Sequence, residues 1–184
     1  EYIVKTIVTT ETIKTIAERN GVEMYDVYTG FKWIANVMRE NEGKKNYIGG
    51  GEESYGFLCE DFVRDKDAVS ACVILAEIAA WAKDQGLSLY QLLQKIYVEY
   101  GFSKEKGISV VKKGKSGAEE IEAMMKKFRE NPLTEIAGSK VTYFYDYSTL
   151  KGKDYAENET VTLDMPTTSN VLQYFTEDNT KVSI

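Results

Sequence analysis

Histidine is absent from this chain of 184 residues, and cysteine and proline each occur only twice. Histidine is the commonest acid or base at neutral pH and the commonest metal ligand, so its absence excludes His-dependent catalytic triads and most zinc sites within the chain. Cys59 and Cys72 do not form a C-x-x-C pair. This spacing favours two buried or unreactive thiols in a reducing compartment, and we therefore expect a cytoplasmic protein.

Long apolar runs are also absent. The longest, Ala68 to Ala82, is interrupted by Ser70 and Glu77 and is too short to span a bilayer. We expect no secretory signal, because Glu1 to Lys5 already has the pattern of a strand. The formal charge of −6 argues against nucleic acid or an anionic membrane as a partner. An anionic ligand would have to be held by local cations.

The composition that remains is that of a globular protein, with 43% hydrophobic and 28% charged residues. A chain of this length can bury a sizeable core in one domain or in two small ones. It lacks an initiator methionine and stops at Ile184 within a strand-like pattern. We therefore expect a piece of a longer protein.

Strands and helices alternate along the first fifty residues. The pattern predicts strands over residues 3–8 and 24–28 and before the glycines at 49–51, with helices from Thr9-Thr10 to Asn20-Gly21 and from Thr29-Gly30 to Asn41. This alternation is typical of βαβ units on a largely parallel sheet.

Two further helices follow. The first begins at Asp65-Lys66-Asp67, ends at Gly86 and is apolar on nearly every side, which predicts burial against a sheet and a second helix at once. Ser88 and Gln91 form a capping box for the next helix, which Gly101 closes. The predicted first domain is residues 1–102, an α/β domain with a βαβ-type mixed sheet and helices.

Residues 103–184 have a different character and predict a smaller, incomplete α+β domain. A Lys- and Gly-rich stretch contains one apolar strand, Ile108 to Val111, and a helix capped by Ser116 and Glu119 runs to Asn131-Pro132. Antiparallel strands are predicted over residues 141–147, 161–163, 171–176 and 181–184. Asp178-Asn179 suits a hairpin turn between the last two.

Three polar clusters could carry function, and the first is the run Gly49 to Gly56. Three consecutive glycines weaken a strand or helix and suit a sharp turn or the close approach of another molecule. The carboxylate of Glu52 can accept hydrogen bonds from two neighbouring sugar hydroxyls, and Ser54 can donate or accept beside it. The alternative is a solvated turn that is acidic for solubility.

The second cluster, Arg64 to Asp67, lies at the predicted start of a helix. Free N–H groups and the helix dipole favour an anion such as phosphate there, and Lys66 adds a full charge. Alternatively, Asp65 or Asp67 caps the helix and the cations pair with Glu60 and Asp61.

The third cluster, Thr29 to Lys32, is a strand-to-helix turn in which Gly30 permits close approach to a ligand, or else it is purely structural. All three clusters fall at strand ends or helix starts. In open α/β sheets ligands bind along that rim, so we expect the clusters to converge there.

These clusters give the chain a resemblance to the α-D-phosphohexomutase superfamily of phosphoglucomutases and phosphomannomutases. Residues 29–34, 51–56 and 64–67 match in the family's order and spacing, and the G-E-x-S string is the family's sugar-recognition loop. The run from Met165 to Ile184 resembles the start of the fourth domain. The resemblance implies that residues 1–102 are most of domain three without its first strand and helix. Residues 103–184 would begin domain four, truncated before its phosphate-binding loop.

Enzymes of this superfamily are isomerases of carbohydrate metabolism. They exchange a phosphoryl group between an enzyme phosphoserine and the 1- and 6-hydroxyls of a hexose, through a bisphosphate that reorients. The resemblance assigns substrate binding to seven residues: Glu52, Ser54, Thr29, Gly30, Lys66, Lys32 and Arg64. Glu53 is expected to point away or to support the loop.

The chain lacks the family's phosphoserine loop and its D-x-D-x-D magnesium loop, so it contains no catalytic residue and no metal ligand. The resemblance implies Mg²⁺ and a glucose 1,6-bisphosphate-type activator for the parent enzyme, and no turnover by the fragment alone. The expected partners are a small-molecule hexose phosphate and the remaining domains of the same chain. An incomplete sheet would also leave an edge open to self-association.

The identity of the sugar phosphate stays open among glucose, mannose, glucosamine and a pentose. Residues 97–101 and 29–33 look closest to the branch that contains phosphopentomutases, whereas Glu52 to Ser54 keeps the hexose-type loop. A non-catalytic sugar- or phosphate-binding module and a purely structural domain are the competing classes.

Overall fold

The computed structural model describes residues 1–184, which divide into two compact units, Glu1–Lys106 and Gly107–Ile184. The sequence prediction placed this division between residues 102 and 103. No helix in either unit combines the length and the apolar character needed to cross a membrane.

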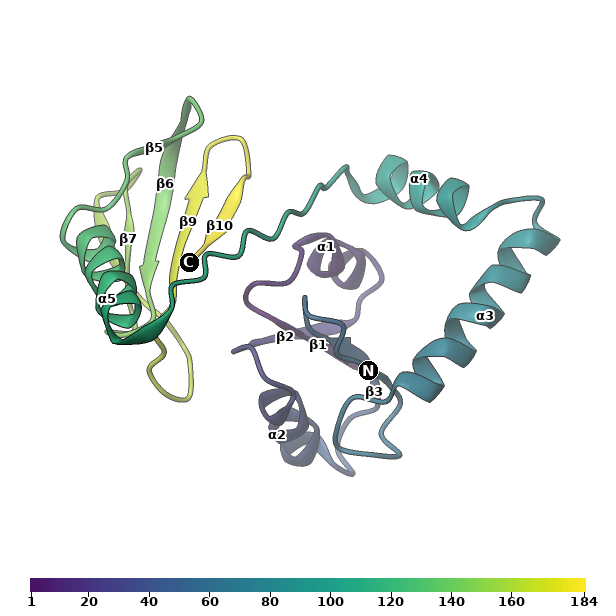
Figure 1. Cartoon of the computed structure of the whole chain (residues 1–184). Coiled ribbons are helices and arrows are strands. Elements are labelled where there is room, and N and C mark those ends of the chain that lie inside the picture. Colours follow the sequence, from purple (N-terminus) through teal and green to yellow (C-terminus); the bar gives the residue numbers. More distant parts are fainter. The chain divides into compact units, whose positions relative to one another are not determined.

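The first unit is built around a four-stranded mixed sheet with the strand order β2-β1-β3-β4 (Figure 1). The parallel strands are β1 (Tyr2–Thr6), β2 (Glu23–Val27) and β3 (Tyr47–Gly51), and β4 (Phe57–Cys59) runs antiparallel to β3. α1 (Thr12–Arg19) links β1 to β2, and α2 (Phe31–Asn41) links β2 to β3. The predicted βαβ pattern and mixed α/β fold are confirmed.

The two faces of this sheet are covered unequally. Val4 and Tyr47 belong to a buried cluster with α2, in which Ile34 is fully enclosed. On the opposite face Ile3 and Ile48 lie beside α1 and border an open, largely apolar pocket of about 420 Å³. Figure 1 shows α1 and α2 on opposite sides of the strands.

The glycines are predicted to form a turn, but the structure places Gly49–Gly51 inside β3, between β1 and β4. A Cβ atom on Gly50 would lie 2.5 Å from the Val4 carbonyl oxygen and 2.6 Å from the Tyr47 hydroxyl. The neighbouring strand and a core tyrosine, rather than a ligand, therefore require glycine here. The turn begins only at Glu52.

Two helices follow the sheet: α3 (Ala68–Asp84) and α4 (Leu89–Tyr100). Ser88 and Gln91 form the predicted capping box of α4. The prediction that the preceding helix is buried is wrong, because Ala82 is its only buried residue and Trp81 is 56% exposed. α3 packs on β4 and α4, and neither covers the apolar residues on its other sides.

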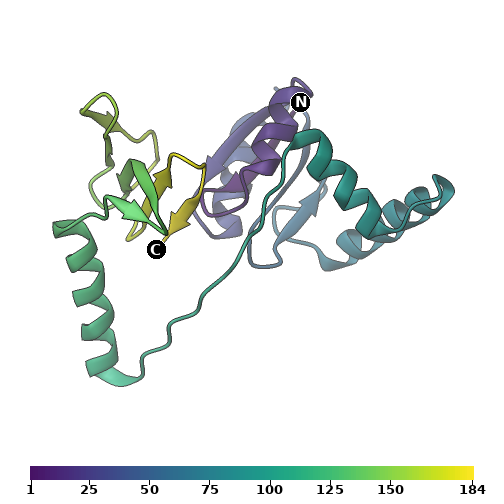
Figure 2. The same cartoon turned by 90° about the horizontal axis from the view of Figure 1, so that it is seen from above.

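Residues 101–113 form neither helix nor strand and run as an extended segment (Figure 2). The strand predicted at Ile108 to Val111 is therefore absent. Ile108 is 78% exposed and has no neighbouring strand to pair with. The next helix also begins earlier than the predicted Ser116–Glu119 capping box, at Gly114.

The second unit consists of α5 (Gly114–Glu130) on an antiparallel sheet with the order β10-β9-β6-β7-β8, in which β5 pairs with β6. The strands are β5 (Glu135–Ile136), β6 (Ser139–Asp146), β7 (Lys151–Asp154), β8 (Glu159–Thr162), β9 (Leu172–Thr176) and β10 (Lys181–Ser183). Met125 of α5 packs against Phe144 and Tyr174 of the sheet. Asn179 adopts a positive φ of 63° between β9 and β10, which confirms the predicted hairpin.

Candidate functional site

The C-terminal ends of β1, β2 and β3 meet at one edge of the sheet, because these three strands are parallel. Thr6 is the last residue of β1, Thr29-Gly30 follows β2, and Glu52-Glu53-Ser54 follows β3. This is the edge at which open α/β sheets bind ligands. Two of the three predicted clusters thus lie at the same rim.

Glu52 joins the glycine-containing loop to the start of α2. Its Oε1 accepts a hydrogen bond of 2.6 Å from the backbone N–H of Gly30, the N-cap residue of α2. A carboxylate is favourable there because the helix N-terminus carries partial positive charge. The backbone N–H of Glu52 also donates to the Gly56 carbonyl at 2.7 Å, which closes the loop. Glu52 Oε2 makes no hydrogen bond and can accept one from a ligand.

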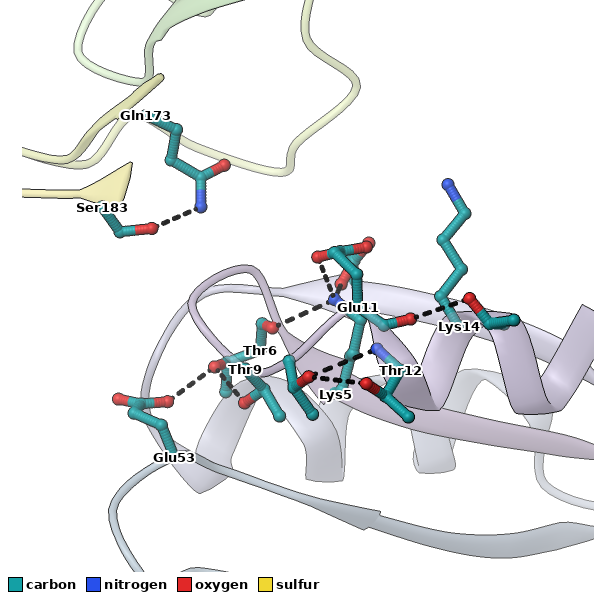
Figure 3. A network of polar contacts seen from close by, with 12 residues as sticks. Lys5, Thr6, Thr9, Glu11, Thr12, Lys14, Glu53, Gln173 and Ser183 are labelled. Atoms are coloured by element: carbon teal, nitrogen blue, oxygen red, sulfur yellow. Dashed lines mark hydrogen bonds and ion pairs between the residues drawn. The ribbon is translucent and has the colours of Figure 1, made fainter. Parts of the chain in front are cut away.

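Glu53 receives three hydroxyl hydrogen bonds at the same rim. Thr6 Oγ1 donates to Oε2 at 2.7 Å, while Thr29 Oγ1 and Ser54 Oγ both donate to Oε1 at 3.3 Å. Thr6 is fully buried and its hydroxyl lies 2.9 Å from that of Thr9 (Figure 3). Glu53 therefore supports the loop and connects two of the predicted sugar-binding side chains to β1.

The predicted cations separate into two groups. Lys66 Nζ lies 5.9 Å from the ring centroid of Phe31, the first residue of α2, and pairs with Asp65 at 3.1 Å. Lys32 also belongs to the first turn of α2. Arg64 instead pairs with Glu42 at the C-terminal end of α2, at 3.0 Å. The helix separates that end from Gly30 by roughly 16 Å.

Asp67 caps α3, which is the structural alternative predicted for the second cluster. It caps α3 by accepting hydrogen bonds from the backbone N–H groups of Ser70, at 2.9 Å, and Val69, at 3.3 Å. These bonds, chiefly those with Ser70, hold the pKa of Asp67 below its usual value. That alternative also paired the cations with Glu60 and Asp61, but Lys66 pairs with Asp65 and Arg64 with Glu42.

Lys5, Thr6 and Thr9 also lie at this rim, and none of them was among the predicted site residues. Lys5 is only 1% exposed, and its Nζ lies 2.6 Å from Asp26 Oδ1. It also lies 3.1 Å from Glu11 Oε1 (Figure 3). The signal was present: a lysine and a threonine end a strand that is otherwise apolar. Polar side chains at the C-terminal end of an inner parallel strand point to the rim of the sheet.

A resident metal ion has no ligand set among these residues. No group of three or more aspartate, glutamate or cysteine side chains comes together in a way that could hold one.

Comparisons with known proteins cover most of the chain. A family model described as phosphoglucomutase/phosphomannomutase, alpha/beta/alpha domain III, matches residues 1–100. The phosphoglucomutase of Staphylococcus aureus (strain MRSA252) is 39% identical over 171 residues, which are 93% of this chain and 31% of that protein. The phosphoglucomutase of Staphylococcus haemolyticus (strain JCSC1435) is 37% identical over 158 residues, 86% of this chain and 29% of that protein.

A solved structure shares the fold. The open form of pp63/parafusin from Paramecium, a phosphoglucomutase, superposes with a TM-score of 0.59 at 17% identity and covers 98% of this chain and 29% of that one. The chain thus spans about three-tenths of the length of the proteins it matches. On the match to the domain III model over residues 1–100, the chain belongs to the phosphoglucomutase/phosphomannomutase family.

Proposed function

We propose that this chain is the sugar-recognition part of a mutase that interconverts hexose 1-phosphate and hexose 6-phosphate. The observation that carries the proposal is the placement of Glu52. Its carboxylate is fixed at the rim by the Gly30 N–H, and Oε2 is left as an acceptor. A carboxylate held in this way suits the hydroxyl groups of a sugar.

Several features of the rim support a sugar phosphate as the ligand. Thr29, Gly30 and Ser54 lie with Glu52 around one carboxylate-rich loop, so the rim offers several acceptors to neighbouring hydroxyls. Lys66 lies near the same helix start and supplies the positive charge that a phosphate needs. Lys32 is a second candidate cation, whereas Arg64 would have to leave Glu42 to take part.

The rest of the parent protein would supply the chemistry. Phosphoryl transfer depends mainly on positioning and on stabilising charge. This chain contributes positioning, and the phosphoserine, the Mg²⁺ site and the phosphate-binding loop would come from other segments. A glucose 1,6-bisphosphate-type activator would start the cycle by supplying the phosphoryl group. We place the parent enzyme in the cytoplasm.

Substrate profiling tests the proposal. The full-length protein that contains this chain is assayed with glucose 1-phosphate and mannose 1-phosphate, and formation of the 6-phosphate is measured. We expect turnover of at least one of them and no turnover by the 184-residue chain alone. Turnover only of a pentose phosphate would move the assignment to a phosphopentomutase. Binding without turnover by the full-length protein would indicate a non-catalytic sugar-phosphate module.

A further inference from the structure

We propose that Glu53 sets the hydrogen-bonding direction of the sugar site. It holds the hydroxyl protons of Ser54 and Thr29, so that these side chains can only accept hydrogen bonds from a ligand. The inference rests on the proposed function and adds a specificity-determining residue to it.

The two oxygens of Glu53 have different neighbours. Oε2 is anchored by Thr6, whose hydroxyl is fully buried at the end of β1 and adjoins that of Thr9 (Figure 3). Oε1 receives the hydroxyls of Thr29 and Ser54, both of which are exposed. One carboxylate therefore connects a fixed point in the sheet to two side chains at the open rim.

The consequence follows from the hydrogen-bonding capacity of each group. A serine or threonine hydroxyl has one proton and two lone pairs, whereas an ionised carboxylate can only accept. While Ser54 and Thr29 donate to Glu53, the atoms that they offer to a ligand are lone pairs. Glu52 Oε2 is also an acceptor.

The part of the site formed by Ser54, Thr29 and Glu52 Oε2 then offers only acceptors, and it selects ligand groups that can donate. A sugar hydroxyl meets this requirement, whereas an ether, a carbonyl or a fluorine at the same position does not. Discrimination against a ligand that leaves a polar group of the site unpaired can be large, because the unsatisfied group loses its hydration without compensation. The inferred ligand class is therefore a sugar phosphate with free ring hydroxyls at the positions facing Ser54.

Fluorinated sugars test the inference. Glucose 1-phosphate and its 2-, 3- and 4-deoxy and deoxyfluoro analogues are titrated into the full-length protein. At each position where the deoxy analogue binds about tenfold more weakly, a loss of about 1.4 kcal/mol, we expect the fluoro analogue to bind equally weakly. A fluoro analogue that binds as tightly as glucose 1-phosphate itself would overturn the inference.

The variant Glu53→Gln tests the role of the carboxylate itself. It should weaken the binding of glucose 1-phosphate by about tenfold and let the fluoro analogue bind more tightly than the deoxy analogue, because a hydroxyl proton is released. In a Ser54→Ala background the effect should shrink to the part that Glu53 exerts through Thr29. Equal effects of Glu53→Gln in both backgrounds would contradict the inference, and Glu18→Gln on α1 is the matched control.

A ligand-independent measurement separates this inference from the proposed function. In the 184-residue chain, Glu53→Ala should speed the hydrogen exchange of the Glu52 and Gly30 amides by about fivefold or more, because the loop loses its anchor on Thr6. Glu53→Gln keeps a carbonyl oxygen that can accept from Thr6 and should change this exchange little. If no sugar phosphate binds the unaltered protein, the proposed function fails. Unchanged exchange in Glu53→Ala would then refute the positioning role as well, and faster exchange would leave only a structural role for Glu53.

Discussion

Replacing Gly50 with alanine should destabilise the first unit, although alanine is ordinarily the better residue in a strand. The added Cβ would lie 2.5 Å from the Val4 carbonyl oxygen and 2.6 Å from the Tyr47 hydroxyl. The Val4 oxygen belongs to the backbone of the adjacent inner strand and cannot move without disturbing the ladder. The Tyr47 hydroxyl is buried and donates to the Leu58 carbonyl at 3.3 Å.

The magnitude follows from three contributions. Overpacking a close-packed region costs about 1–3 kcal/mol. Loss of the Tyr47 hydrogen bond adds about 1 kcal/mol. The lower backbone entropy of alanine in the unfolded chain offsets roughly 0.5–1 kcal/mol of this loss of stability. We therefore expect Gly50→Ala to lower the free energy of unfolding by about 1–3 kcal/mol.

Gly49→Ala is the matched control, because its Cβ would lie 3.3 Å from the Leu58 carbonyl oxygen and at an ordinary van der Waals distance of 3.9 Å from the Cys59 Cα. A small shift of the Leu58 oxygen suffices, so the change should stay within about 1 kcal/mol. The assay is urea unfolding followed by the fluorescence of Trp33, which packs against the core of the first unit, in a Trp81→Phe background. A single-unit probe is needed because the chain contains two units. Equal stability of the two alanine variants would refute the steric reasoning.

Three further predictions concern the rim and its surroundings. Gly56→Ala should displace the Glu52 carboxylate, which packs over Gly56, and so weaken glucose 1-phosphate binding by about tenfold with little change in the urea midpoint. Lys5→Met should change the free energy of unfolding by less than about 1 kcal/mol, since methionine fills the space of the buried Lys5 side chain. Lys5→Ala leaves that space empty and should cost about 2–4 kcal/mol, measured by the same urea unfolding. The folded-state pKa of Asp67 lies below its unfolded value, so its stabilisation of α3 should be present above about pH 4 and fall as the pH drops through the folded pKa. Hydrogen exchange of the Ser70 amide measures this stabilisation, and Asp67→Asn should remove its dependence on pH.

Local patterns in the sequence predicted most of the element order. The alternation of β-branched runs with helical spacing located β1 to β3, α1 and α2, and the Ser88–Gln91 capping box located the start of α4. These features depend on neighbours close in sequence, which a single sequence displays directly.

Features that depend on distant neighbours could not be predicted in the same way. The glycine run signals backbone freedom, but only the approach of Val4 and Tyr47 explains why it forms a strand. The apolar run of α3 predicts burial, but whether another element covers it is a tertiary question. The short strands β4, β5 and β7 were missed because two to four residues carry little periodicity. Only Val161 and Val182 marked the equally short β8 and β10.

The candidate site was likewise predicted only where it depends on local sequence. Parallel strand ends predicted that residues 29–30 and 52–54 would meet, and the Gly30–Glu52 hydrogen bond confirms that they do. The buried side chain that anchors Glu53, Thr6, comes from β1, 47 residues away in sequence. No spacing rule connects Thr6 to Glu53.

The most direct test of the sugar-recognition role is calorimetric titration of glucose 1-phosphate into the full-length protein and its Glu52→Ala variant. Glu18→Ala, on the exposed side of α1, is the control. Loss of hydrogen bonds to a charged acceptor should weaken binding by roughly 10- to 100-fold in Glu52→Ala and leave the control unchanged. Equal affinity in Glu52→Ala and the unaltered protein would contradict the assignment of the rim as the sugar site.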